Sequence, residues 1–163
     1  MLDWVTPLAP SATMEAMSTL RIARPVYDSI RAHGEQTYPH ECCGALLGRS
    51  APEGWQVTAA VRAANTRTDS AHNRYHIDPR ELVRIQRDAA RQGLDIAGFY
   101  HSHPDHPAQW SQTDFAEAHW IGCAYVITEV AQGRAAQTNS FLLAGTTEED
   151  KRFETQTVEI EPA

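Results

Sequence analysis

Apolar residues follow two kinds of pattern that predict β-strands. From Trp55 to Val61 they recur at every second position, which is typical of a half-buried strand. Elsewhere, short and nearly continuous apolar runs bounded by turn-forming residues indicate strands buried on both faces. The strands expected on these grounds span residues 18–22, 42–48, 55–61, 75–77, 96–102, 122–128, 138–144 and 155–160.

Helical spacing of apolar residues predicts three helices between these strands. The first begins at Pro25 and ends near residues 34–39. The second begins at Asp78-Pro79-Arg80-Glu81, a run that supplies a capping residue, a proline in the first turn and a capping-box glutamate, and it ends near residue 93. The third is expected over residues 111–120.

Interleaved strands and helices predict an α/β (α+β) fold, with a central mixed β-sheet flanked by helices. The 163 residues fit one globular domain, expected over residues 18–163, and 42% apolar residues suffice for a packed core. Residues 1–17 show no periodicity and are expected to form an N-terminal extension. They lack a basic start and a continuous apolar run, so we expect neither a signal peptide nor a membrane span, which favours a cytoplasmic location.

Charge and cysteine content exclude further classes. Lys and Arg number 14 against 21 Asp and Glu, and the net charge of −7 argues against a nucleic-acid-binding protein that works through a basic surface. Three cysteines, two of them adjacent, do not fit a disulfide framework, and we expect them to be buried in the core. Arginines recur at helical spacing from Arg80 to Arg91, and they fit either a solvated helix face or a patch for an acidic partner.

Histidines concentrate in one region that predicts a metal site. His101 and His103 are two residues apart at the end of an expected strand, so both imidazoles project from one face with Cα atoms about 6–7 Å apart. Asp114 follows Ser111 by three residues on the expected helix, where it can supply a third ligand. Two histidines and one carboxylate are an accepted catalytic zinc set that leaves a fourth position for water.

A metal hydrolase also needs a base, and Glu41, immediately before the buried run 42–48, is the candidate. Plainer interpretations stay open. Glu41 also fits an exposed charge after a proline turn, Ser111 and Asp114 fit a helix N-cap with its first-turn carboxylate, and the two histidines fit uncoordinated polar residues. A cysteine nucleophile would need an exposed thiolate, which the apolar setting of the cysteines disfavours.

The run His101-Ser-His103-Pro104, followed by Ser111-x-x-Asp114 and preceded by Glu41, resembles the JAMM motif of the MPN+ (JAB1/MPN/Mov34) zinc metallopeptidases of the small prokaryotic type. Residues 39–48 also resemble the stretch around that family's catalytic glutamate, and the resemblance covers roughly residues 18–145. It implies a sheet flanked by helices, broadly like the cytidine deaminases, and hydrolysis of peptide or isopeptide bonds.

The resemblance also implies a role for each residue of the motif. His101, His103 and Asp114 would bind Zn²⁺. Glu41 would be the general base and proton shuttle, and Ser111 would stabilise the charge that develops on the carbonyl oxygen. The implied partner is a ubiquitin-like protein of the sulfur-carrier kind, cleaved after its C-terminal Gly-Gly, with no nucleic acid or membrane involved.

Alternatives to this function remain at the level of sequence. They are a deconjugase of a bacterial ubiquitin-like or defence system, a small-peptide peptidase, and a non-catalytic MPN scaffold without metal. The loop beside the metal residues departs from many small relatives at two positions. His106 fits a spare ligand, a gate or a solvated side chain, and Trp110 fits loop packing better than substrate contact. The oligomeric state stays open.

Overall fold

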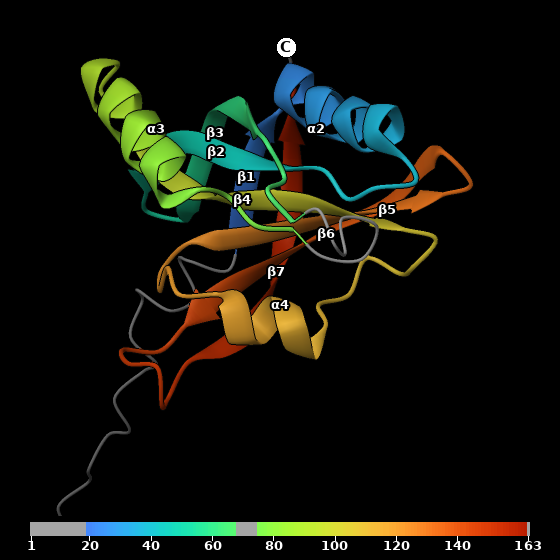
Figure 1. Cartoon of the computed structure of the whole chain (residues 1–163). Helices are drawn as coiled ribbons and strands as arrows, with labels where there is room; N and C mark the ends of the chain where they lie inside the picture. Colours follow the sequence, from blue (N-terminus) through green and yellow to red (C-terminus); the bar gives the residue numbers. More distant parts are fainter. Residues whose placement is uncertain (1–18, 68–74, 163) are drawn as a thin grey trace, which may run out of the picture.

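The computed structural model describes residues 19–67 and 75–162, and its elements follow one another as Figure 1 shows. In chain order they are β1 (Thr19–Ala23), α2 (Arg24–Thr37), β2 (Cys43–Ala51), β3 (Gly54–Ala63), α3 (Pro79–Arg91), β4 (Asp95–Pro104), α4 (Gln112–Glu117), β5 (Ala124–Ala131), β6 (Arg134–Ala144) and β7 (Arg152–Glu161). The expected extension over residues 1–17 lies outside the described residues.

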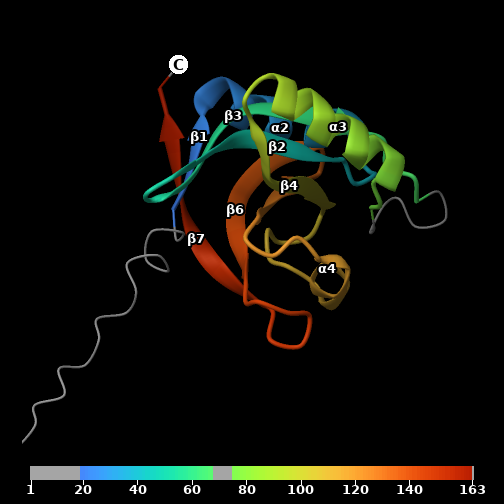
Figure 2. The ribbon, with the colours of Figure 1, turned by 90° about the vertical axis from the view of Figure 1, so that its left-hand side faces the viewer.

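The strands form one mixed sheet, which confirms the expected fold class. β1 pairs in parallel with β3 and β7, β4 pairs in parallel with β5, and the other pairings are antiparallel. The strand order β1-β3-β2-β4-β5-β6-β7 closes on itself because β7 returns to β1. Figure 2 shows this curved wall. The helices α2 and α3 lie on opposite faces of it, because alternate residues of the same strands pack against each. The closure into a barrel goes beyond the central mixed sheet that the sequence predicts.

Buried side chains fall into two clusters that use alternate positions of the same strands. In one cluster, residues of β2 and β4 such as Leu46 and Tyr100 pack against Val26 and Ile30 of α2. In the other, the adjacent residue of each strand, Leu47 of β2 or Phe99 of β4, packs against Ile85 and Ala89 of α3. β2 and β4 are therefore buried on both faces, which explains their nearly continuous apolar sequences.

Some expected boundaries are wrong. Residues 75–77 form no strand; their chain is held to the end of β3 by the Thr66 N–H, which donates to the His76 carbonyl at 2.9 Å. The helix expected over 111–120 ends at Glu117, because Ala118 adopts an extended conformation. β6 begins at Arg134 and not at residue 138; its first four residues are mostly exposed and carry no large apolar side chain that would indicate a strand.

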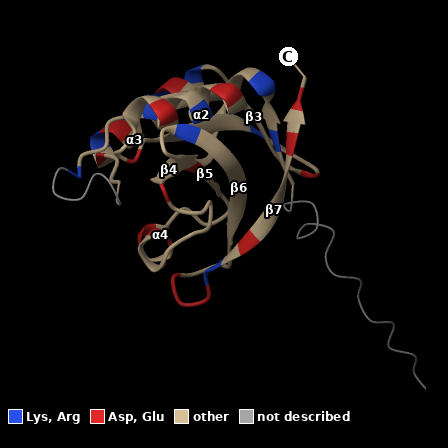
Figure 3. Ribbon diagram, turned by 90° about the vertical axis from the view of Figure 1, so that its right-hand side faces the viewer, with Lys and Arg blue, Asp and Glu red and all other residues tan. Residues whose placement is uncertain are grey.

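The arginines of α3 lie among acidic residues on a charged helix face. Figure 3 shows basic and acidic residues interspersed along this helix. Three of its arginines have acidic neighbours at its start or on the same helix: Arg80 with Asp78, Arg84 with Glu81 and Arg91 with Asp88. This pairing supports the solvated helix face over a patch for an acidic partner. In the part of the chain that is described, no helix is both long and apolar enough to cross a membrane.

Candidate metal centre

The end of β4 presents two imidazoles on one face. His101 and His103 point to the same side, whereas Tyr100 and Ser102 point to the side covered by α2. The Nε2 atoms of the two histidines lie 3.1 Å apart, and both side chains are buried. The alternation of the strand thus produces the convergence that the spacing predicts.

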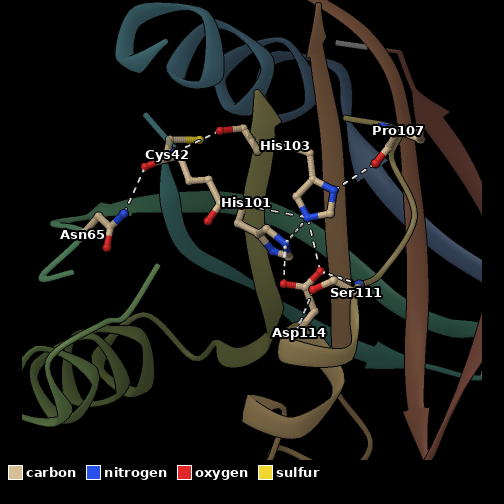
Figure 4. A network of polar contacts seen from close by, with 9 residues as sticks. Cys42, Asn65, His101, His103, Pro107, Ser111 and Asp114 are labelled. Carbon is tan, nitrogen blue, oxygen red and sulfur yellow. Dashed lines mark hydrogen bonds and ion pairs between the residues drawn. The ribbon is translucent and has the colours of Figure 1, made fainter. Parts of the chain in front are cut away.

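Helix α4 brings a carboxylate to the same point. Ser111 is its N-cap and accepts the Asp114 N–H through Oγ at 3.0 Å, while the Asp114 carboxylate accepts the Ser111 N–H at 2.8 Å. This capping box holds the carboxylate toward β4, with Oδ1 3.3 Å from His101 Nε2 and Oδ2 3.2 Å from His103 Nε2. Figure 4 shows the three side chains directed at one another. Capping and convergence coexist in the same residues.

These donors fit a tetrahedral divalent ion. Ligands bound to zinc at 2.0–2.1 Å in tetrahedral geometry lie about 3.3 Å from one another. Here the two Nε2 atoms lie 3.1 Å apart, and each lies 3.2–3.3 Å from one oxygen of the Asp114 carboxylate, Oδ1 for His101 and Oδ2 for His103. His103 Nδ1 donates to the Pro107 carbonyl at 2.8 Å, which fixes the tautomer and leaves the Nε2 lone pair for a ligand. Both the spacing and the donor chemistry therefore match zinc.

Glu41 stands beside this triad because of strand register. Cys43 of β2 pairs with His101 of β4 in antiparallel register, so the residue two positions before Cys43 lies next to His103. The Glu41 Oε1 atom is 3.9 Å from His103 Nε2, and Oε2 is buried without a hydrogen-bond partner. Donor atoms of Glu41, His101 and His103 all lie within 4.8 Å of one another, so Glu41 is a second carboxylate near the imidazoles.

The pKa values of the two carboxylates, Glu41 and Asp114, are shifted in opposite directions. Burial raises the pKa of Glu41 to about 8, against the opposing effect of His103. Burial acts on Asp114 in the same direction, but His101 and the hydrogen bonds from the histidines and from Ser111 outweigh it and hold the pKa of Asp114 well below its usual value. Asp114 is thus charged, as a ligand must be, whereas Glu41 accepts a proton near neutral pH.

Two residues that sequence reasoning did not assign to the site support it. The Asn65 side chain donates to the Glu41 carbonyl at 3.3 Å and accepts the N–H groups of Arg67 and His76 at 3.1 Å each. It therefore ties the chain at Glu41 to both described ends of the segment between β3 and α3. The ring of Tyr75 stacks on His101 with 4.5 Å between ring centroids. A polar residue following a strand gives too weak a signal to reveal either contact from sequence.

A cleft of about 330 Å³ opens beside the metal residues and is lined by Glu41, His103, Ser111, Trp110 and the neighbouring loop residues. Trp110 is 37% exposed, and its ring lies 5.6 Å from Phe115 and 5.5 Å from Phe153 between centroids. It therefore packs the loop, as expected, and also forms one wall of the cleft. His106 lines the same cleft.

The cysteines are buried, as expected, and free. Burial raises the pKa of the Cys42 thiol to about 11 and that of Cys123 to about 12, and it raises the pKa of Cys43 further. A thiol that is neutral and inaccessible at physiological pH is a poor nucleophile. The arrangement therefore favours metal-assisted chemistry over a cysteine mechanism.

Comparison with known proteins finds one matching family model and several similar chains. A family model described as prokaryotic homologs of the JAB domain matches residues 23–143. A desampylase of Haloferax volcanii is 37% identical over 114 residues, covering 68% of this chain and 80% of that protein. A protein of Thermus thermophilus named "Probable TtuB-protein conjugate cleaving protease" is 32% identical over 101 residues, which span 62% of this chain and 64% of that protein.

The fold has known counterparts as well. The solution structure of a protein from Desulfitobacterium hafniense superposes with a TM-score of 0.75 and 23% identity, over 88% of this chain and 94% of that one. At this level of identity the likeness concerns the fold alone. It agrees with the mixed sheet and flanking helices described above.

Proposed function

Because the chain belongs to the prokaryotic homologs of the JAB domain, we propose that it is a zinc-dependent isopeptidase that releases a ubiquitin-like protein from its conjugates. That the chain is a hydrolase is confirmed by its relatives, a desampylase and a conjugate-cleaving protease. The observation that carries the finer proposal is the convergence of His101, His103 and Asp114, with Glu41 beside them.

His101, His103 and Asp114 would hold the ion. Asp114 is preferred over Glu41 as the third ligand because its oxygens lie 3.2 and 3.3 Å from the imidazole nitrogens, against 3.9 Å for Glu41. A zinc ion bound there would polarise the scissile carbonyl and make water more acidic. The Asp114 side chain is 12% exposed, and its charge would compensate part of the positive charge of a bound ion.

Glu41 moves the proton. Glu41 lines the cleft next to His101, His103 and Asp114. Its Oε2 atom has no hydrogen-bond partner, so this oxygen is available to accept a proton. A carboxylate with a pKa raised to about 8 takes a proton readily from an attacking water and can pass it to the departing amine. The amine needs this proton because an unprotonated amide nitrogen is a poor leaving group.

Ser111 orients the carbonyl oxygen. Its Oγ already accepts the Asp114 N–H at 3.0 Å, so the hydroxyl proton remains available to donate. Because Ser111 lines the same cleft as Glu41, this proton can be directed at a substrate carbonyl bound there. A fixed donor of this kind stabilises negative charge as it develops.

The substrate is inferred from the relatives. One of them is named for conjugates of the protein TtuB, and the other is a desampylase. We extend this to a ubiquitin-like protein of the sulfur-carrier kind, joined through its C-terminal Gly-Gly to a lysine or to another amine. Glycines at this position suit a buried site because they add no side chain next to the reacting carbonyl.

The test is cleavage of defined conjugates by the zinc-loaded protein. A small ubiquitin-like protein ending in Gly-Gly is joined to the Nε atom of a lysine peptide, and the same protein ending in Ala-Ala serves as the control. We expect release of the Gly-Gly conjugate only, abolished by a chelator and restored by Zn²⁺. Equal cleavage of both conjugates, or cleavage of unrelated free peptides at a similar rate, would contradict the proposal and favour a general peptidase.

A further inference from the structure

The helix that carries Asp114 needs support from outside itself. α4 has six residues, from Gln112 to Glu117, and none of them is buried. A helix this short is marginal on its own, because few of its hydrogen bonds repay the cost of nucleation. The capping box stabilises the first turn of α4, so its last turn must be stabilised by contacts with other parts of the chain.

Lys151 holds the last turn. Its Nζ donates to the Ala118 carbonyl at 2.8 Å, directly after the helix, and lies 5.0 Å from the centroid of the Phe115 ring. It also pairs with Glu148 at 2.8 Å, and the Lys151 side chain is only 6% exposed. A cation at the carbonyl end of a helix is favourable both as a hydrogen-bond donor and through the helix dipole.

The connection between β6 and β7 fixes the position of this lysine. Asp150 accepts the N–H groups of Thr146 and Thr147 and both of their hydroxyls, which closes a turn just before Lys151. Glu148 bridges Lys151 and His119, the residue after Ala118. Figure 3 shows this acidic loop beside α4. The lysine is therefore held on two sides before it reaches the helix.

We propose that Lys151 is a positioning residue for the metal centre: by binding the end of α4 it keeps Asp114 and Ser111 aimed at β4. The proposal rests on the proposed function, since it assigns those two residues to the ion and the carbonyl oxygen. Lys151 is the single lysine among the 14 cationic residues of the chain. The point charge of an ammonium suits one carbonyl and one carboxylate in a tight space.

Substitution separates the charge from the packing. Lys151→Met keeps an unbranched apolar stem and removes the donor, and Lys151→Arg restores a donor. Arg152→Met is the matched control, because Arg152 is the next residue and pairs with Glu154 on the surface. Zinc affinity is measured by competition with a chromophoric chelator, and kcat and KM are measured on the Gly-Gly conjugate.

We expect Lys151→Met to weaken zinc binding and to lower kcat by about tenfold each, with a change in KM below about twofold, as for other groups that orient metal ligands. Lys151→Arg should recover most of both losses, and Arg152→Met should match the wild type. If Lys151→Met binds zinc and turns over like the wild type, or if KM alone changes, Lys151 does not position the site.

The single lysine allows a second measurement that needs no substitution at Lys151. Acylation of Lys151 by an amine-reactive ester is followed by mass spectrometry of the peptide that contains it. If the ion and Lys151 hold α4 from opposite ends, zinc should slow this acylation several-fold in the wild type but not in Asp114→Ala. The same rate with and without zinc in the wild type would overturn the proposal.

These outcomes also separate the two proposals. A wild-type protein that binds zinc through Asp114 but cleaves no conjugate overturns the proposed reaction and leaves the role of Lys151 to be decided by zinc affinity and acylation. A wild-type protein that binds no zinc overturns both.

Discussion

Glu41 and His103 face each other across the pairing of β2 and β4, with Oε1 3.9 Å from Nε2. The contact follows from register, because Cys43 pairs with His101. Next to this pair, the Cys42 N–H donates to the Ser102 hydroxyl at 2.9 Å, and the Ser102 N–H donates to the Cys42 carbonyl at 3.2 Å. Two residues 62 positions apart in sequence are thus set by neighbouring backbone hydrogen bonds. A side chain held in this way keeps its place without a hydrogen bond of its own at Oε2.

Glu41→Gln should keep zinc and lose turnover. The amide preserves shape but cannot take a proton, so we expect kcat to fall by about 10²–10⁴-fold while zinc stays near one equivalent by elemental analysis. Glu35→Gln, the same change on an exposed residue of α2, is the control. Cleavage of the Gly-Gly conjugate by Glu41→Gln at the wild-type rate would show that another group is the base.

Zinc should stabilise the wild type against unfolding, and Asp114→Asn should lose this effect. At a free zinc concentration of about 1,000 times Kd, a ligand that binds only the folded state adds about 4 kcal/mol to the free energy of unfolding. Differential scanning fluorimetry with and without zinc measures the shift. Asp28→Asn, which changes an exposed carboxylate of α2 beside Arg24, should retain it. An equal shift in Asp114→Asn would remove Asp114 from the ligand set.

Acid should weaken the fold through His33. This histidine is buried, with Nδ1 2.8 Å from the Tyr100 hydroxyl, and burial, assisted by Arg62, lowers its pKa from 6.5 to about 4. The unfolded chain therefore takes up this proton first as the pH falls, so stability is retained above about pH 6.5 and is lost between there and pH 4.

The size of this effect can be isolated with one variant. We expect the free energy of unfolding in urea to fall by about 2 kcal/mol more in the wild type than in His33→Gln between pH 7 and 4.5. His40→Gln, at an exposed histidine, should show the wild-type dependence. Parallel pH profiles for the wild type and His33→Gln would exclude His33 as the source.

Gly98→Ala should destabilise the centre of the sheet. A Cβ atom at Gly98 would lie 2.0 Å from the Ala124 carbonyl oxygen of β5, a backbone atom that cannot move without disturbing the strand pairing. We expect a loss of about 2–4 kcal/mol in urea unfolding. Gly34→Ala, whose Cβ would meet a Val130 methyl at 3.0 Å, should cost clearly less. Equal losses would mean that the strands separate more easily than their pairing indicates.

Local signals predicted the parts of this fold that local interactions determine. The predicted start of α3 is confirmed. Asp78 caps the helix by accepting the Arg80 N–H at 2.8 Å, an interaction between residues only two apart. The shared face of His101 and His103 is correct for the same reason, since strand alternation needs no other part of the chain. The proximity of Glu41 and Asp114 to them was inferred from the motif, and strand register and the capping box now explain it.

Long-range contacts account for what the sequence did not reveal. The early end of α4 coincides with the Ala118 carbonyl that accepts from Lys151, 33 residues later. The closure of the sheet depends on the pairing of β1 with β7, and the sequence pattern of either strand does not predict which strand it pairs with. Asn65 joins three backbone segments through one amide, which is visible only once those segments are placed together.

The closing strand also sets the order in which the enzyme becomes complete. All five proposed catalytic and metal-binding side chains precede residue 115, whereas Lys151 and β7, which closes the sheet against β1, follow more than 30 residues later. During synthesis on the ribosome, all proposed metal ligands are therefore translated before β7, the strand that closes the barrel. We expect the newly made protein to stay inactive toward conjugates until β7 has emerged from the exit tunnel.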